Sequence, residues 1–177
     1  MLLPWGETTV LGQVVSTFAK TGVSEIVVVT GGQREVVETE AARWAEKPPV
    51  RCVHNPAHER GEMLSSLQCG LAGLGSEVES ALIGLGDQPQ LSLEAARKVV
   101  AAFEWPGARL IIPSFNQRRG HPWLVERSLW PEIMALRPPQ TLRDFLNAHT
   151  GEIFYVETDE SVLKDLDTPD EYRREKP

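Results

Sequence analysis

An aspartate follows a short apolar run in the middle of the chain. Residues Ala81 to Gly86 are apolar and end in glycine, and Asp87-Gln88-Pro89 comes directly after them. Glycine lets a ligand approach the backbone, and proline stiffens the turn. The carboxylate of Asp87 is a hard oxygen ligand of the kind that Mg²⁺ prefers. An ordinary turn, in which the aspartate bonds its own backbone, explains the same residues, so both interpretations stay open.

A second polar group precedes a helix that the apolar pattern predicts from about residue 63. Asn55 opens a polar loop, and Gly61, Met63, Ser65 and Ser66 follow it. The free backbone amides and hydroxyls at a helix start attract anions and hydrogen-bond acceptors. This arrangement favours nucleotide binding, although serines that only cap their own helix produce the same pattern.

A concentrated cationic patch follows the fourth predicted strand. Arg118-Arg119-Gly120-His121-Pro122 places two guanidinium groups beside a histidine in a chain whose net charge is −7. Arginine grips phosphate oxygens in a two-pronged manner, so the patch suits an anionic group. A solvated loop is the alternative.

The fourth group lies near the end of the chain. Thr168 is a natural helix N-cap, with Pro169 at the first helical position and acidic residues in the first turn. The cap does not account for Asp167, which is therefore a candidate for a second metal-binding carboxylate. The neighbouring Asp165 belongs to the same acidic segment.

The elements that position these groups alternate along the chain. β-Branched and apolar runs predict strands at 25–30, 50–54, 81–86 and 108–113, and helical stripes cover 8–21, 33–45, 63–74 and 92–103. The run at 25–30 is nearly continuous, so we expect it to be buried on both faces. Alternation of this kind predicts an α/β fold, with a mainly parallel sheet covered by helices on both faces.

From residue 114 the pattern changes, but the sheet continues. We expect a polar loop at 114–120, a short strand at 123–125, helices at 129–136 and 142–149, and a strand at 152–156. No linker rich in proline, glycine and serine divides the halves, so residues 1–177 are predicted to form a single domain.

Composition excludes several classes of protein. The net charge of −7 provides no basic stripe for nucleic acid. The sequence has no apolar run of about 18 residues and no signal peptide, and its two cysteines indicate a reducing compartment. We therefore expect a cytoplasmic protein that does not bind membranes.

Taken together and in order, the four groups resemble the molybdenum cofactor nucleotidyltransferases. The resemblance rests on the motifs Gly-Asp-Gln-Pro, Asn-Pro…Gly-x-Met-x-x-Ser-Leu, Arg-Gly-His-Pro and Asp-x-Asp-Thr-Pro. These motifs look most like the cytidylyltransferase branch. The resemblance implies a Rossmann-like three-layer fold and transfer of CMP from CTP to molybdopterin, with pyrophosphate released. It also implies Mg²⁺ as the cofactor, and a molybdenum hydroxylase as the partner that receives the product.

The resemblance also assigns roles. Asp87 and Asp167 would be the catalytic and metal-binding carboxylates. The nucleotide would be bound by Asn55, Gly61, Met63, Ser65, Ser66, Gln88 and Pro89. Molybdopterin would be bound by Arg119, Gly120, His121 and Pro122.

The opening of the chain departs from the family pattern. That pattern begins with a strand and a glycine-rich loop of the form Leu-Ala-Ala-Gly-x-Ser-x-Arg-Met-Gly-x-x-Lys, whereas Met1 to Gly6 resembles the residues just after that lysine. The resemblance thus implies that the first strand and the triphosphate loop are absent, which predicts slow transfer. A guanylyltransferase that uses GTP, and a non-catalytic module that binds the cofactor or a partner, are the main alternative functions. A sugar-phosphate or isoprenoid-precursor nucleotidyltransferase is a third, but it leaves Arg-Gly-His-Pro unexplained.

Overall fold

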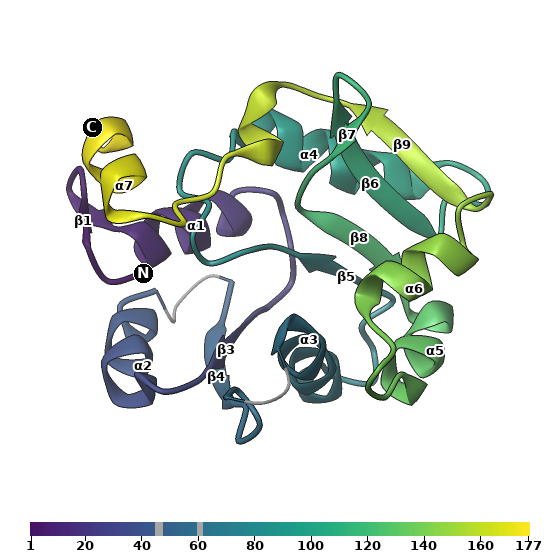
Figure 1. Cartoon of the computed structure of the whole chain (residues 1–177), viewed down its shortest axis with the longest axis horizontal. Coiled ribbons are helices and arrows are strands. Elements are labelled where there is room, and N and C mark those ends of the chain that lie inside the picture. The colour runs from purple at the N-terminus through teal and green to yellow at the C-terminus, as the bar shows by residue number, and fades with distance from the viewer. Residues whose placement is uncertain (45–47, 60–61) are drawn as a thin grey trace.

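The computed structural model describes residues 1–44, 48–59 and 62–177. Strands and helices alternate through the first half, as the apolar pattern predicts (Figure 1). In chain order these are β1 (Pro4–Trp5), β2 (Thr8–Thr9), α1 (Val10–Ala19), β3 (Ile26–Thr30), α2 (Arg34–Ala42), β4 (Val50–His54), α3 (Glu62–Gly73), β5 (Ser80–Ile83) and α4 (Leu93–Ala101). The predicted end of α2 at residue 45 lies outside the described residues.

The second half adds short elements around two long strands. They are η1 (Ala102–Glu104), β6 (Leu110–Phe115), β7 (Arg118–Arg119), β8 (Trp123–Glu126), η2 (Arg127–Leu129), α5 (Trp130–Ala135), α6 (Leu142–Ala148), β9 (Ile153–Glu157), η3 (Glu160–Leu163) and α7 (Pro169–Glu175). None of the helices in the described residues has the length and apolar character needed to cross a membrane.

The main strands form two separate hydrogen-bonded groups. Strands β3 and β4 pair in parallel, from Ile26 opposite Val50 to Thr30 opposite His54. The larger sheet has the order β5-β8-β6-β7, and β9 pairs in parallel with β6. Strand β8 runs antiparallel to both β5 and β6. The sheet is therefore mixed, because the chain returns into β8 without a crossover helix.

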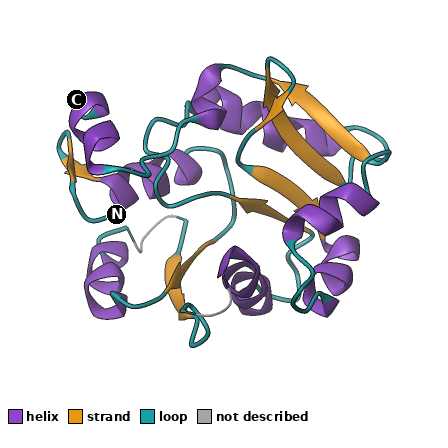
Figure 2. Ribbon diagram, viewed as in Figure 1, coloured by secondary structure: helices purple, strands orange, loops and turns teal. Residues whose placement is uncertain are grey.

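Helices cover both faces of these strands, which confirms the predicted α/β class (Figure 2). Leu110 and Ile112 of β6 face a cluster that includes residues of α3, α5 and α6. Ile111, between them, faces Val99 of α4. Alternate residues of one strand thus reach opposite helical layers, as the pleat of a strand requires.

Two predicted boundaries are wrong, and both corrections concern the candidate site. The strand predicted at 81–86 ends at Ile83, so residues 84–86 belong to the loop that carries Asp87. The loop predicted at 114–120 is a hairpin, with β6 running to Phe115 before β7 begins. Asn116 and Gln117 both have positive φ, at 50° and 63°, as the central residues of a two-residue hairpin turn require.

Strand β3 is less buried than its sequence predicts. Residues Ile26 to Val29 are half-buried and only Thr30 is fully buried, at 2% exposure. The reason is a cavity of about 660 Å³, which has residues of β3 and β5 in its walls. One side of β3 therefore faces open space.

Ser92 connects the start of α4 to η3. Its Oγ accepts from the Ala95 amide at 3.0 Å and donates to Asp159 Oδ2 at 2.7 Å, and its own amide donates to Ser161 Oγ at 3.0 Å. Burial alone would raise the pKa of Asp159, but hydrogen bonds from Ser161 and Ser92 outweigh it and lower that pKa. This network keeps the segment after η3 beside the loop that carries Asp87.

We predict that Ser92→Ala lowers the free energy of unfolding by about 1 kcal/mol, the usual loss for a serine N-cap. Asp159 has a lowered pKa in the folded state. The stability that ionised Asp159 contributes to the fold is therefore complete above its unfolded pKa, and it is lost as the pH falls through its folded pKa. Urea denaturation at neutral and at acidic pH should show a difference between wild type and variant that shrinks in acid. Ser76→Ala is the control, because Ser76 makes only an exposed contact with Glu77; equal losses in both variants would contradict the assignment.

Candidate functional site

Asp87 lies in the loop that follows β5, and one of its carboxylate oxygens has no partner. Its Oδ1 is buried and makes no hydrogen bond within the described residues. The Asp87 carbonyl accepts from the Leu166 amide at 3.0 Å, so the acidic segment near the end of the chain runs directly beside this loop. An unpaired buried oxygen is costly, and such a group commonly marks a ligand position.

Burial and neighbouring negative charges raise the pKa of Asp87. Burial is the largest cause, and the negative charges of Asp165 and then Asp167 act in the same direction. A hydrogen bond from the Asp87 backbone and the charge of the N-terminal amine oppose the shift. Asp167, which the sequence singles out, does act electrostatically on Asp87. Asp165 raises the pKa of Asp87 more strongly than Asp167 does, and the sequence interpretation gave Asp165 no role.

Both of these neighbouring aspartates are exposed. In residues 1–44, 48–59 and 62–177, no three side chains of histidine, cysteine, aspartate or glutamate are arranged to hold a metal ion. A cation bound here would therefore need water or substrate oxygens as further ligands, as Mg²⁺ usually does. Sharing of one ion by Asp87 and Asp167 stays a prediction.

The residues that follow Asp87 are buried. Pro89 is buried, and Gln88 is 3% exposed, with no partner for its Oε1 in the described part of the chain. Ahead of them, a Cβ on Gly86 would lie 2.5 Å from Met1 Sδ, so the Met1 side chain packs directly against this loop. The loop is thus held tightly from both ends.

Asn55 joins the end of β4 to the start of α3. Its side-chain amide donates to Ser65 Oγ at 2.8 Å and to Ser66 Oγ at 3.1 Å, while its Oδ1 accepts from the Ala57 amide. At 2% exposure the side chain is occupied by protein groups. Asn55 therefore fixes the start of α3 to the end of β4. A direct contact of Asn55 with nucleotide stays a prediction.

The other predicted nucleotide residues lie at the start of α3. Met63 is exposed at 46%, and both Met63 and Ser66 line the cavity between β3 and β5. Ser65 is half-buried beside Asn55. Gly61 lies outside the described residues.

His121 is held in a neutral state. Burial lowers its pKa to about 4, and the opposing charge of Asp165 does not compensate. The ring stacks on Trp123 at 4.7 Å between centroids, and its Nε2 is buried without a hydrogen-bond partner among the described residues. The His121 amide donates to the Val162 carbonyl at 2.9 Å. A Cβ on Gly120 would collide with that same residue of η3, so the glycine allows η3 to approach.

Arg119 lies on the surface hairpin. It is exposed on β7, and its Nε donates to the Tyr155 hydroxyl at 2.8 Å while its guanidinium lies 5.6 Å from the centre of the Tyr155 ring. Pro122, in contrast, is fully buried beside His121. The structure therefore separates this motif into an exposed cation and a half-buried histidine. Among the described residues, no hydrogen bond or ion pair links Arg119 to the Asp87 loop.

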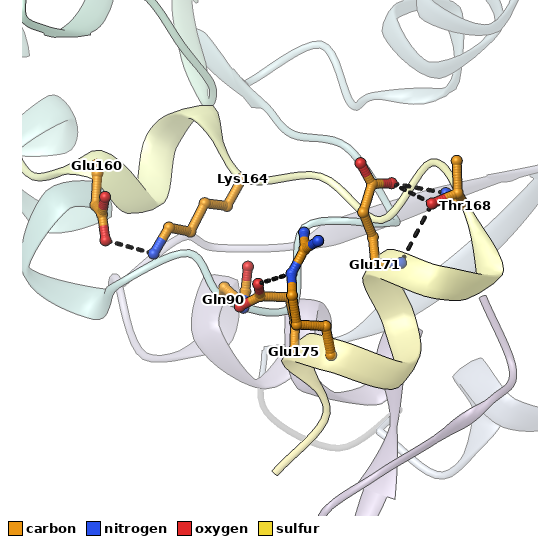
Figure 3. A network of polar contacts seen from close by, with 7 residues as sticks. Gln90, Glu160, Lys164, Thr168, Glu171 and Glu175 are labelled. Atoms are coloured by element: carbon orange, nitrogen blue, oxygen red, sulfur yellow. Dashed lines mark hydrogen bonds and ion pairs between the residues drawn. The ribbon is translucent and has the colours of Figure 1, made fainter.

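Polar contacts flank the acidic segment at 165–167 (Figure 3). Lys164 pairs with Glu160 before it, and Thr168 bonds Glu171 after it. Thr168 and Glu171 form the predicted cap, with Thr168 Oγ accepting from the Glu171 amide at 3.2 Å and Glu171 Oε2 accepting from the Thr168 amide at 2.8 Å. Gln90 Nε2 donates to Glu175 Oε2 at 2.8 Å, which attaches α7 to the loop after Asp87. The cap interpretation of Thr168 is confirmed.

Two further polar residues end the neighbouring strands. Thr30 and His54 are opposite each other at the ends of β3 and β4, and Thr30 Oγ1 and His54 Nδ1 are buried without partners in the described chain. The signal in the sequence is their position, because the carboxyl ends of parallel strands form the usual binding edge of an α/β sheet.

Solved structures of other proteins resemble the chain over nearly its full length. Rv0371c from Mycobacterium tuberculosis H37Rv is 26% identical, with a TM-score of 0.80 over 98% of this chain and 86% of that one. Its complex with manganese gives 24% identity and a TM-score of 0.79 over 98% and 89% of the two chains. The 4-diphosphocytidyl-2C-methyl-D-erythritol synthase of Anaerococcus prevotii shares the fold at 15% identity, with a TM-score of 0.78 over 97% and 86%.

No curated protein matches the chain. The model of the MobA-like NTP transferase domain, however, matches residues 1–153, which is most of the sequence. The family match includes the Asp87 loop and the His121 segment and ends before the acidic segment at 165–167. The chain therefore belongs to the MobA-like NTP transferase domain family.

Proposed function

We propose that this nucleotidyltransferase moves CMP from CTP to molybdopterin and releases pyrophosphate, with a divalent cation at Asp87. The observation that carries the proposal is the buried Oδ1 of Asp87, which has no hydrogen-bond partner among the described residues and lies in the loop after β5, beside the acidic segment at 165–167. Family membership supports the reaction class. The order of the four sequence groups supports the choice of CTP and molybdopterin.

The donor set around Asp87 fits a hard cation. Ionisation of Asp87 is unfavourable, because partial burial and then the charges of Asp165 and Asp167 raise its pKa. A divalent cation would remove that cost, and Mg²⁺ is commonly held by one or two carboxylates together with substrate phosphates. When bound, the ion would neutralise charge that develops on the transferred phosphoryl group. The manganese complex of Rv0371c is a reason to test manganese as well.

The side chains of the protein would contribute by binding and orienting the two substrates. The attacking group is a phosphate anion, so the reaction needs no strong general base. His121, with a pKa of about 4, would be neutral near pH 7 and could exchange one hydrogen bond with the acceptor. Arg119, Gly120 and Pro122 would lie on the molybdopterin side, while the start of α3 and the Gln88-Pro89 turn would lie on the CTP side.

Transfer is measured as pyrophosphate release from CTP, molybdopterin and Mg²⁺. For residues 1–177 tested by themselves we expect release near background, because no glycine-rich loop of the family form lies within them and each oxyanion-type donor commonly contributes about 10²–10³ in rate. A version with a family-like glycine-rich segment ahead of Met1 should be faster by about 10² or more and should prefer CTP to GTP. If that version binds CTP and molybdopterin yet releases no pyrophosphate, the protein is a binding module.

Replacing Asp87 by asparagine should stabilise the metal-free protein near neutral pH. The folded pKa of Asp87 is raised, so its ionised form destabilises the fold at every pH above that value, and a neutral amide removes the penalty. The difference should shrink as the pH falls below the folded pKa, and the two proteins should converge below the unfolded pKa. Thermal unfolding with and without Mg²⁺ or Mn²⁺ tests this, since cation at 100 times its Kd stabilises wild type by about 2.7 kcal/mol. An undiminished cation effect in the variant would exclude Asp87 as a ligand.

Arg119→Ala should weaken molybdopterin binding by about 1.5–3 kcal/mol, the scale of a charged hydrogen bond, and leave CTP binding nearly unchanged. Arg118→Ala is the matched control, since Arg118 is the exposed neighbour in the same two-residue strand. Calorimetry with each ligand separately distinguishes the two sides of the site. Equal losses for both ligands, or for both arginines, would contradict the assignment.

A further inference from the structure

Strand β9 forms the outer edge of the larger sheet, at the side opposite β5 (Figure 1). In the described part of the chain it pairs with β6 alone. The amide of Thr158, just after β9, donates to the Ser114 carbonyl of β6. Because backbone groups alternate in direction along a strand, those of Ile153, Tyr155 and Glu157 point away from β6. The open edge therefore presents a row of amides and carbonyls that another strand can bind.

The side chains along this edge do not protect it. Soluble proteins usually shield an edge strand with lysine, proline or a bulge, whereas the run Ile-Phe-Tyr-Val passes through β9 without interruption. Tyr155 is 43% exposed. Trp105 is 54% exposed and stands edge-on to Phe154, with 4.9 Å between the ring centroids. An apolar strand edge beside an exposed tryptophan is typical of a surface that associates with another polypeptide.

We propose that β9 pairs with β9 of a second copy of this chain, antiparallel and about a two-fold axis at Tyr155. In that register Tyr155 lies opposite the partner's Tyr155, and Ile153 lies opposite the partner's Glu157. The backbone groups that point away from β6 then all meet counterparts, because they are arranged symmetrically about residue 155. The larger sheets of the two copies would continue into each other across the axis.

The side chains of β9 fit a second copy in this antiparallel register. Phe154 and Val156 share one face of the sheet, so Phe154 would lie opposite the partner's Val156, with Trp105 beside the pair. Aromatic and β-branched residues are favourable cross-strand neighbours. Glu157 is the only charged residue of β9, and this register places it opposite an isoleucine. A parallel register would place the two Glu157 carboxylates side by side, which is destabilising.

The symmetry of the edge favours a second copy over an unrelated extended peptide. One strand supplies both halves of the match, as the self-complementary surface of a two-fold dimer requires. Two strands of this length and their tryptophans bury less area than a standard interface, so we expect a transient dimer with a Kd of about 10–100 µM. The Asp87 loop follows β5, at the other edge of the larger sheet. The dimer therefore does not rest on the proposed function.

Sedimentation equilibrium over about 1–300 µM, a range that spans the expected Kd, measures the association. The mean mass should rise from the 19.7 kDa of one chain towards twice that value. Tyr155→Pro should remain monomeric throughout, because proline removes an amide that points away from β6 and is tolerated on an edge strand. Circular dichroism checks that this variant folds.

Two cysteine variants test the register, and they decide the matter even if Tyr155→Pro fails to fold. In Tyr155→Cys the two-fold axis brings the cysteines to about 5.5 Å between Cα atoms, a separation that a disulfide spans. Glu157→Cys is the matched control on the same face of β9, because its two copies would lie roughly 13 Å apart along the strand. Oxidation with copper phenanthroline should cross-link Tyr155→Cys roughly tenfold faster than Glu157→Cys. Both variants retain Cys52 and Cys69, so the native thiols affect them equally.

Three results would overturn the proposal. They are a wild-type protein that stays monomeric at the highest concentration, a folded Tyr155→Pro variant that dimerises like wild type, and cross-linking of Glu157→Cys as fast as that of Tyr155→Cys. An unrelated extended peptide that protects β9 from hydrogen exchange, in a protein that does not self-associate, would assign the edge to another polypeptide instead. Mass and cross-linking are measured without substrates, so failure here is distinct from failure of pyrophosphate release.

Discussion

Pairing of β6 on both of its edges is the interaction on which the larger sheet depends. Leu110, Ile111 and Ile112 are fully buried, at 0% exposure. Their backbones pair with β9 on one side, and those of Leu110 and Ile111 pair with β8 on the other. Successive side chains reach opposite helical layers. A shift of one residue would reverse the two faces, so the register of this strand is strongly determined.

The candidate site depends on that register. Strand β9 leads into η3, and the Val162 carbonyl of η3 accepts from the amide of His121, which follows the β6–β7 hairpin. The chain then passes Asp87, where the Leu166 amide donates to the Asp87 carbonyl. The parallel pairing of β9 with β6 therefore brings the acidic segment to the loop after β5. Packing of helices α1 and α3, rather than strand pairing, holds the β3–β4 pair beside this edge.

Electrostatics distinguish the site from the rest of the surface. Salt bridges elsewhere are mostly exposed pairs such as Arg34 with Glu38, which contribute little to stability. At the site, Asp87 has a raised pKa and His121 a lowered one, and Asp87 Oδ1 and His121 Nε2 have no hydrogen-bond partner among the described residues. Two half-buried groups that disfavour their own charged forms, close to one acidic segment, are typical of a position adapted to a ligand.

Local chemistry made much of this structure predictable from the sequence alone. Helical stripes and β-branched runs determined the order of the elements and the α/β class, and Thr168 with Pro169 determined the start of α7, because these signals act within a few residues. Tertiary structure alone decided the rest. The half-exposed β3 follows from a cavity that no local pattern reports. Asp165 raises the pKa of Asp87 more than Asp167 does, because the segment around Leu166 contacts the Asp87 loop. These segments are almost 80 residues apart, and sequence spacing carries no information about their distance in space.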